Sequence, residues 1–454
     1  MLAEKMLSSV VSLLGGKYFK LDPTPGVTLP DPNPKQHYML YMHVPFCEVL
    51  CPYCSFNRFP FERDRALKYF ESMREEMRRL ADRGYTFEEV YVGGGTPTVM
   101  MDQLAQTIGL ARELFPSIRD VSSETNPNHL VPGYLEDLSS LVQRLSVGVQ
   151  SFDDDMLKRM ARYNKYGSSQ VIFERIRSVA DAKLFKSLNV DMIFNFPAQT
   201  EEILRRDLEM VIEGGSGQTT FYPLMASPSV EKSLAATVGK VDYNREKQFY
   251  EIICSLLTEG ENAPFEFGSA WTFNRKNVHH ASCDSDVAAG ASAGAAENEA
   301  MIDEYVVNYE EYPAIGSGGI TYLGHDLYVN TFSVNEYNTA IEAGNMSLMG
   351  KTSFTLRDRM RYRFMMQLFG LRLDKRAFER DFGMSVELGL PMEMAFMRLN
   401  GAFATDNAEE LTLTPKGRYL TVVMMRQFFI GVNGLRDQAR AALQGEERQL
   451  IFGE

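Results

Sequence analysis

Apolar and polar positions along residues 38–224 switch repeatedly between the period of a strand and the period of a helix. Helical spacing is clearest over residues 61–84, where Leu67, Phe70, Met73 and Met77 recur with charges between them. Strands alternating with helices predict a parallel sheet, so we expect an α/β fold with a full or partial (β/α) barrel of the TIM type. The strands expected are Tyr38–His43, Glu88–Val92, Asp120–Glu124, Arg144–Val149, Leu188–Phe194 and Thr219–Leu224.

The flanking regions follow other patterns. Residues 1–37 hold a short apolar segment, predicted as an amphipathic helix packed on the protein or touching a membrane surface, and then an extended connector with five prolines. We expect residues 38–350 to form the barrel with its extension. Within them, residues 284–300 are small and acidic and predict a flexible insertion. Residues 351–454 predict a small, mainly helical domain with winged-helix character.

Two elements are expected in this last domain. Arg357–Leu371 is predicted as a helix, and Thr412–Leu420 as a strand and turn before a final helix from Thr421.

Three cysteines directly follow the first predicted strand. Cys47, Cys51 and Cys54 have C-x3-C-x2-C spacing, and thiolates are favoured ligands of iron–sulfur clusters. Three of them can bind three irons of a cubane and leave the fourth iron open to a small chelating ligand. A disulfide is disfavoured in a long chain with five cysteines. A structural zinc site completed by Cys283 with His279 and His280 stays open as an alternative.

The sequence YMHVPFCEVLCPYCSF, residues 41–56, resembles the radical S-adenosylmethionine (SAM) enzymes. The closer resemblance is to their coproporphyrinogen III oxidase-like branch. In that family the open iron binds SAM and cleaves it to a 5′-deoxyadenosyl radical. The resemblance implies a [4Fe-4S] cluster, two SAM molecules in this branch, and an electron donor such as flavodoxin or ferredoxin.

Motifs further along the chain extend this resemblance. Gly93–Thr96, in YVGGGTPT, resembles the family's site for the amino group of SAM, although a glycine triplet alone is often only a tight turn. Glu124 and Asn126 end a strand, where a carboxylate can accept hydrogen bonds from a ribose or an ammonium group. The alternative for this pair is a helix cap or turn.

Two later strands also match the family. In RLSVGVQSF, Gln150 is the better ligand candidate, whereas Arg144 could form a salt bridge at the base of the barrel. Asp191 lies among apolar neighbours and therefore needs a partner. Lys165 or Arg162 could take the place of the family's basic residue after the strand that ends at Gln150. The resemblance implies that the cluster and the SAM molecules are surrounded by Tyr41, Tyr53, Phe56, Gly93, Gly94, Gly95, Thr96, Glu124, Asn126, Gln150, Lys165, Asp191, Ile193, Gly318 and Ile320.

Some segments depart from the oxidase pattern. Ser55 and Phe56 stand where the oxidase has a further cysteine, the late turn reads GSGGIT, and the tail VVMMRQFFIGVNGLRDQAR is different. These departures resemble the class C radical SAM methyltransferases, most of all the group that methylates menaquinone at carbon 8. We therefore expect a methyltransferase that uses two SAM molecules, with Tyr222, Tyr322 or His325 as the proton acceptor. The alternatives are an oxygen-independent coproporphyrinogen III oxidase-like or haem-degrading enzyme and a haem chaperone.

Composition narrows the range of binding partners and locations that we expect. The 454 residues carry a net charge of −13, which argues against nucleic acid because phosphates bind basic surfaces. Clustered cysteines suit a reducing compartment, so we expect a cytoplasmic protein. We also expect a monomer. The apolar segment near the N-terminus is too short to span a bilayer. With a menaquinone substrate, peripheral contact with the inner face of the membrane would follow as a hypothesis.

Overall fold

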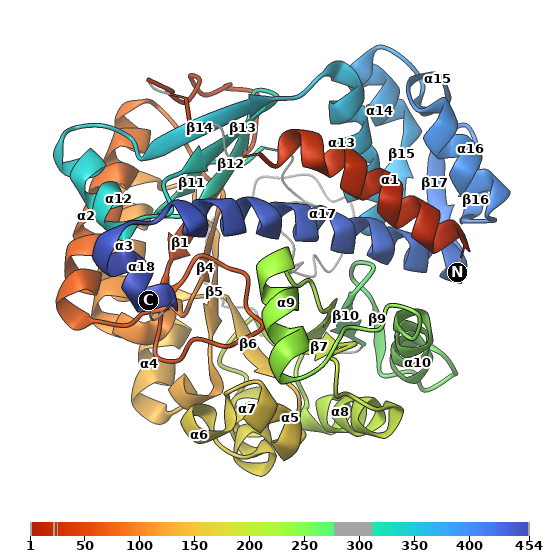
Figure 1. Ribbon diagram of the computed structural model, residues 1–454, viewed down its shortest axis with the longest axis horizontal. Coiled ribbons are helices and arrows are strands. Elements are labelled where there is room, and N and C mark those ends of the chain that lie inside the picture. The colour runs from red at the N-terminus through yellow and green to blue at the C-terminus, as the bar shows by residue number, and fades with distance from the viewer. Residues whose placement is uncertain (1, 21–22, 25, 277–310, 453–454) are drawn as a thin grey trace, which may run out of the picture.

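The computed structural model describes residues 2–20, 23–24, 26–276 and 311–452 (Figure 1). A nine-stranded sheet has the order β11-β1-β4-β5-β6-β7-β8-β10-β9. Its central strands are all parallel: β1 (Met39–Val44), β4 (Glu89–Gly94), β5 (Asp120–Thr125), β6 (Arg144–Gln150), β7 (Ser187–Phe194) and β8 (Gln218–Pro223). The edges are β11 (Ala314–Ile315), which is parallel to β1, and the antiparallel β10 (Thr272–Arg275) and β9 (Phe265–Phe267). The predicted α/β barrel is confirmed in its partial, open form.

Helices between the parallel strands cover the outside of this sheet (Figure 1). They are α2 (Arg63–Asp82), α3 (Met101–Leu114), α4 (Pro132–Leu141), α5 (Asp154–Arg159), α6 (Tyr163–Tyr166), α7 (Ser169–Ala182) and α8 (Glu201–Gly214), with α10 (Glu246–Thr258) packed against α8. Helix α9 (Pro228–Thr237), directly after β8, packs instead against the long helix of residues 415–442. The apolar stripe of α2 is buried as its spacing predicts, Phe70 and Met73 included. Glu76 is buried on the same helix, where its carboxylate accepts hydrogen bonds from Gly316 N and Tyr337 Oη.

A second sheet follows the barrel. It is antiparallel and consists of β12 (Ile320–Leu323), β13 (Asp326–Asn330) and β14 (Leu348–Ser353), with α12 (Val334–Glu342) before β14. Cys283, His279, His280 and residues 284–300 lie outside the described residues, so the zinc alternative and the insertion stay predictions. Across the described ranges, no helix is both long enough and apolar enough to cross a membrane.

The C-terminal region has the element order of a winged helix. Its elements are α13 (Leu356–Phe369), β15 (Arg372–Asp374), α14 (Lys375–Phe382), α15 (Val386–Gly389), α16 (Pro391–Leu399), β16 (Phe403–Asp406) and β17 (Glu410–Leu413). The three strands form one small antiparallel sheet in which β16 and β17 are the wing. The predicted helix at 357–371 corresponds to α13.

Two helices near the chain ends lie together across the open side of the barrel. The 28-residue α17 (Pro415–Ala442) crosses the molecule, and α1 (Leu2–Tyr18) packs along it, while the short α18 (Gly445–Phe452) follows (Figure 1). The predicted start of α17 at Thr421 is wrong by six residues. Thr414 caps the helix, because its Oγ1 accepts from Gly417 N at 3.1 Å, and Pro415 occupies the first helical position.

Candidate active site

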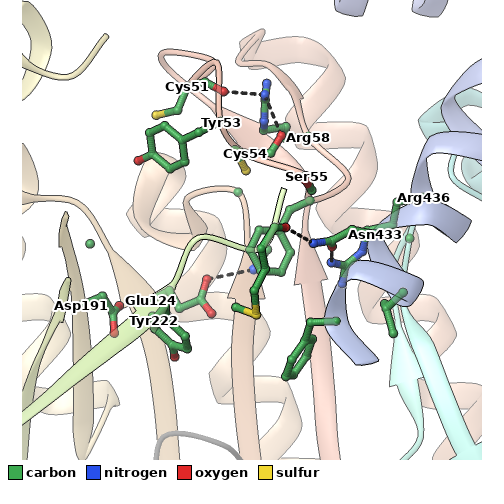
Figure 2. Close-up of a pocket in the computed structure, with 18 of the residues that line it drawn as sticks. Cys51, Tyr53, Cys54, Ser55, Arg58, Glu124, Asp191, Tyr222, Asn433 and Arg436 are labelled. Carbon is green, nitrogen blue, oxygen red and sulfur yellow. Dashed lines mark hydrogen bonds between the residues drawn. The ribbon is translucent and has the colours of Figure 1, made fainter. Parts of the chain in front are cut away.

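One cavity of about 350 Å³ lies at the carboxyl ends of the parallel strands. Gly94, Glu124, Gln150 and Asp191 reach it from the ends of β4, β5, β6 and β7. Parallel strands bring their carboxyl ends to one edge, which is where barrel proteins place reacting groups. Helix α17 closes the opposite side of the cavity (Figure 2).

The cysteine loop forms one wall of the cavity. Cys47, Cys51 and Cys54 are free thiols that all line it. Arg58 Nη2 donates to the carbonyls of Cys51 at 2.7 Å and Cys54 at 3.1 Å, which holds the loop in place (Figure 2). Burial and the other two thiols raise the pKa of Cys47 to about 12. A cationic cluster would reverse that shift by stabilising the thiolates.

Three free thiols at one wall of the cavity are the donor set that an iron–sulfur cubane takes, with one thiolate on each of three irons. In the described part of the chain, no three His, Cys, Asp or Glu side chains form a site for a single metal ion. Arg162 Nη1 lies 3.5 Å from Cys51 Sγ, and Thr96 Oγ1 lies 3.8 Å from Cys47 Sγ. These donors could stabilise sulfur that carries negative charge.

A connected polar set adjoins the thiols. Glu124 accepts hydrogen bonds from Gly94 N and Tyr91 Oη, both at 3.1 Å. Asn126 links the neighbouring groups, because its Nδ2 donates to Thr96 Oγ1 and its Oδ1 accepts from Arg162 Nη2, each at 2.8 Å. The carboxylate and the amide are therefore held in fixed directions at the cavity wall.

The glycine triplet serves close packing. A Cβ atom at Gly95 would lie 2.6 Å from the carbonyl oxygen of Phe46, and one at Gly94 would lie 2.8 Å from the His43 ring. Gly94 also has φ of 117°, which other residues rarely adopt. The triplet lets β4 approach β2 (Phe46–Cys47) of the cysteine loop, so its backbone lines the cavity.

Asp191 has the partners that its apolar surroundings require. Its carboxylate accepts from Ser146 Oγ at 2.8 Å and from Asn189 Nδ2 at 2.7 Å. Gln150 lines the same wall in a left-handed conformation with φ of 77°. Arg144 does not line the cavity and donates to Gln218 Oε1 at the buried base of the sheet.

A buried hydrogen-bonded chain connects the first strand to the late glycine turn. His43 Nε2 lies 2.9 Å from the carbonyl of Asn57, so this nitrogen is the donor, and Tyr41 Oη donates to His43 Nδ1 at 3.1 Å. Burial lowers the pKa of His43 to about 4, which keeps the ring neutral. Asn57 Nδ2 donates to the Ser317 carbonyl at 3.1 Å, which fixes the turn that places Gly318 at the cavity.

The remainder of the cavity is an aromatic chamber. Tyr322 packs against Tyr362 and Phe354, with ring centroids 4.9 and 5.6 Å apart. Such walls suit an apolar ring compound, because aromatic rings pack in offset or edge-on contact. The chamber is lined by Phe19, Tyr41, Tyr91, Tyr222, Tyr312, Tyr322, Phe354, Tyr362, Phe428 and Phe429.

Most residues predicted for the cofactors and the cluster meet at this cavity, but three do not line it. Lys165 is exposed and pairs with Glu48 at 2.7 Å, whereas Arg162 lines the cavity. His325 is exposed in the turn between β12 and β13, which is incompatible with the predicted proton transfer. Gly93 lies behind Glu124 and leaves room for its carboxylate. The predicted residues that do line the cavity are Cys47, Cys51, Cys54, Tyr41, Tyr53, Phe56, Gly94, Gly95, Thr96, Glu124, Asn126, Gln150, Asp191, Ile193, Gly318, Ile320, Tyr222 and Tyr322.

Sequence reasoning missed several lining residues. Arg58 follows the cysteines by four positions, and a basic residue so close to three thiols was an available signal. Asn433 and Arg436 lie on α17, within the tail segment that the sequence analysis singled out, but neither was named there as a site residue.

The comparisons with known proteins agree with this fold. Residues 41–211 match the family model described as the radical SAM superfamily. It is 26% identical over 400 residues to "Heme chaperone HemW" of Bacillus subtilis (84% of this chain, 96% of that protein). It is 24% identical over 412 residues to "Oxygen-independent coproporphyrinogen III oxidase" of Helicobacter pylori (86% and 85%). Among solved structures, coproporphyrinogen III oxidase (HemN) from Escherichia coli has the same fold, with a TM-score of 0.67 and 19% identity over 86% of this chain and 90% of that one.

These relatives overturn one expectation. The menaquinone methyltransferase interpretation is wrong, because the relatives over most of the chain are haem chaperones and oxidases. That interpretation depended on Ser55 and Phe56, the GSGGIT turn and the tail, and the structure shows the tail to be part of α17, a wall of the cavity. The residues of such a wall pack against neighbouring helices and do not identify a reaction by themselves.

Proposed function

We propose that the protein is a SAM-cleaving enzyme of the coproporphyrinogen III oxidase type that acts on an apolar ring compound in the aromatic chamber. One observation carries this proposal: a single cavity is continuous from the three thiols, through the polar set, to the aromatic walls. Oxidases of this name are among the relatives that share most of the chain.

Each part of the cavity has a separate role in this proposal. Cys47, Cys51 and Cys54 would hold a [4Fe-4S] cluster, and the polar set around Glu124, together with Asp191, would hold SAM. When bound, the cluster and SAM supply an electron and a 5′-deoxyadenosyl radical that removes a hydrogen atom from the substrate. The second SAM molecule stays a prediction, supported by Tyr53, Ile193, Gly318 and Ile320, which line the same cavity.

The chain's own side chains would position and shield the reactants. Arg58 and Arg162 place positive charge beside the thiols, where thiolates would otherwise repel one another. Glu124 and Asp191 can accept hydrogen bonds from ammonium or hydroxyl groups in fixed directions. The aromatic walls exclude water, which protects a reactive species from side reactions.

Anaerobic turnover tests the proposal. Reconstituted protein with reductant and SAM should form 5′-deoxyadenosine faster when coproporphyrinogen III is added, and mass spectrometry should detect loss of CO₂ from the tetrapyrrole. The matched control is Cys54→Ala, which removes one thiolate and should abolish both products. 5′-Deoxyadenosine formation that no tetrapyrrole accelerates would contradict the oxidase proposal.

A haem chaperone is the second candidate. The observation in its favour is the 26% identity to the Bacillus subtilis chaperone over nearly that protein's full length. Haem iron is often bound through histidine, and the described residues that line the cavity include no histidine. Stoichiometric binding of haem, released intact and without SAM cleavage, would favour the chaperone over the enzyme.

A further inference from the structure

Two polar side chains reach the cavity from α17, opposite the ends of the barrel strands. Figure 2 shows Asn433 and Arg436 extending from this helix toward the cavity, across from Asp191 and Tyr222. The Arg436 side chain is buried, and its residue is only 8% exposed. Burying a guanidinium group is unfavourable unless hydrogen bonds or an ion pair compensate for its lost hydration.

The orientation of Arg436 is fixed by contacts on two sides. Its Nη1 donates to Asn433 Oδ1 at 2.7 Å, and Asn433 Nδ2 donates to the Met225 carbonyl at 2.6 Å. Its guanidinium group also lies over the Phe56 ring, 4.6 Å from the ring centroid. Arg436 is therefore held between the cysteine loop and the segment that follows β8, and its fork does not swing freely.

The other charged residues that line the cavity belong to its thiol and SAM end. Arg58 bonds the cysteine loop, Arg162 bonds Asn126, and Asp191 bonds Ser146. Arg436 instead comes from α17, the helix that also carries Phe428 and Phe429 of the aromatic chamber. Burial raises the pKa of Tyr312 to about 12, and the positive charge of Arg436 opposes that rise.

We propose that Arg436, oriented by Asn433, binds a carboxylate of the substrate and so selects apolar ring compounds that bear carboxylate side chains. The guanidinium fork matches a carboxylate with two parallel hydrogen bonds. The aromatic chamber provides the complementary apolar contact for the ring. This inference rests on the proposed function for its substrate class, and it assigns Arg436 to positioning and specificity.

Equilibrium binding of coproporphyrin III tests the inference. The full-length protein with its cluster reconstituted is titrated with coproporphyrin III and, separately, with its tetramethyl ester, and porphyrin fluorescence is followed. Arg436→Met should weaken binding of the free acid roughly ten- to hundred-fold, the effect of losing a hydrogen-bonded charge pair. The ester should bind wild type and variant alike. Arg436→Lys, which keeps the charge but loses the fork, should give an intermediate loss.

Arg440→Met is the matched control. Arg440 lies one turn further along α17 and pairs with Asp437 without lining the cavity, so this variant should bind coproporphyrin III as wild type does. An equal loss for acid and ester in Arg436→Met would overturn the inference. So would a loss of affinity for SAM, which would assign Arg436 to the SAM carboxylate.

The readout separates this inference from the proposed function, because porphyrin binding requires no turnover. Selective loss of acid binding without any coproporphyrinogen-dependent reaction would support the Arg436 site and reject only the oxidase activity. If the wild-type protein turns over coproporphyrinogen III and Arg436→Met binds the free acid of coproporphyrin III as tightly as wild type does, only the Arg436 site is rejected.

Discussion

The buried Asp207 should make stability depend on pH in the direction opposite to that of a typical aspartate. Burial raises the pKa of its carboxyl to about 7 from the usual 3.8, although Phe152 N and Ser151 Oγ donate hydrogen bonds to it. Between about pH 4 and pH 7, the folded state therefore retains a proton that the unfolded chain has already lost. Stability falls over this window as pH rises, because the folded state binds more protons there.

The magnitude follows from the shift. A change of about three pKa units at about 1.36 kcal/mol each gives about 4 kcal/mol between pH 4 and pH 8. Asp207→Asn removes the ionisation and keeps an acceptor for Phe152 N. Its free energy of unfolding should therefore rise relative to wild type by up to that amount as pH increases.

Urea denaturation at pH 4.5, 6 and 8 measures this difference. The single tryptophan, Trp271, is fully buried and reports unfolding by its fluorescence. Asp155→Asn, at an exposed position beside Lys158, is the control and should show no such trend. A difference between Asp207→Asn and wild type that stays the same at all three pH values would refute the reasoning. The outcome matters for the site, because Ser151 and Phe152, which donate to Asp207, directly follow Gln150 at the cavity wall.

Three further predictions test the fold and the site. Arg426→Met should lower the free energy of unfolding by about 3–5 kcal/mol in urea denaturation, because Glu246 would remain buried without its cationic partner, whose Nε lies 2.9 Å away. Replacing Glu246 by Leu as well should restore much of that stability. No recovery in the double variant would contradict the pairing argument. Arg162→Ala should weaken SAM binding in equilibrium dialysis roughly tenfold or more, whereas Lys165→Ala should change it by less than about twofold; equal effects would reject the assignment of the basic residue. Gly95→Ala should cost about 1–3 kcal/mol of stability in thermal unfolding, because its Cβ would meet the Phe46 carbonyl; an unchanged melting temperature would show that β4 can retreat from the cysteine loop.

The parallel strands could be predicted because their signals are local. The strand predicted at 144–149 is β6 (Arg144–Gln150), and the one predicted at 188–194 is β7 (Ser187–Phe194). Each is a short apolar run bounded by turn residues, so few neighbours are needed to recognise it. The start of α17 was missed although its signal is also local, since Thr414 followed by Pro415 is a cap and first-turn pair.

Side chains that depend on long-range packing could not be predicted from spacing. Lys165 and Arg162 are three residues apart on a short helical segment, and only the fold shows which of them faces the cavity. His325 carries suitable chemistry but lies in an exposed hairpin turn. Glu76 occupies the apolar face of α2, and its buried partners Gly316 and Tyr337 lie about 240 and 260 positions later.

The two halves of the cavity come from different parts of the chain, and this explains why the methyltransferase interpretation failed. The polar half is formed by strand ends within residues 41–211, the part that matches the radical SAM model. Much of the aromatic half, including Tyr312, Tyr322, Tyr362 and Phe428, lies beyond that match. A motif can therefore identify how the radical is made while leaving open what it acts on. Because α17 contributes Asn433 and Arg436 to the cavity, substitutions at Arg436 test the proposed specificity more directly than changes at the thiols, which in the proposed function would stop every reaction alike.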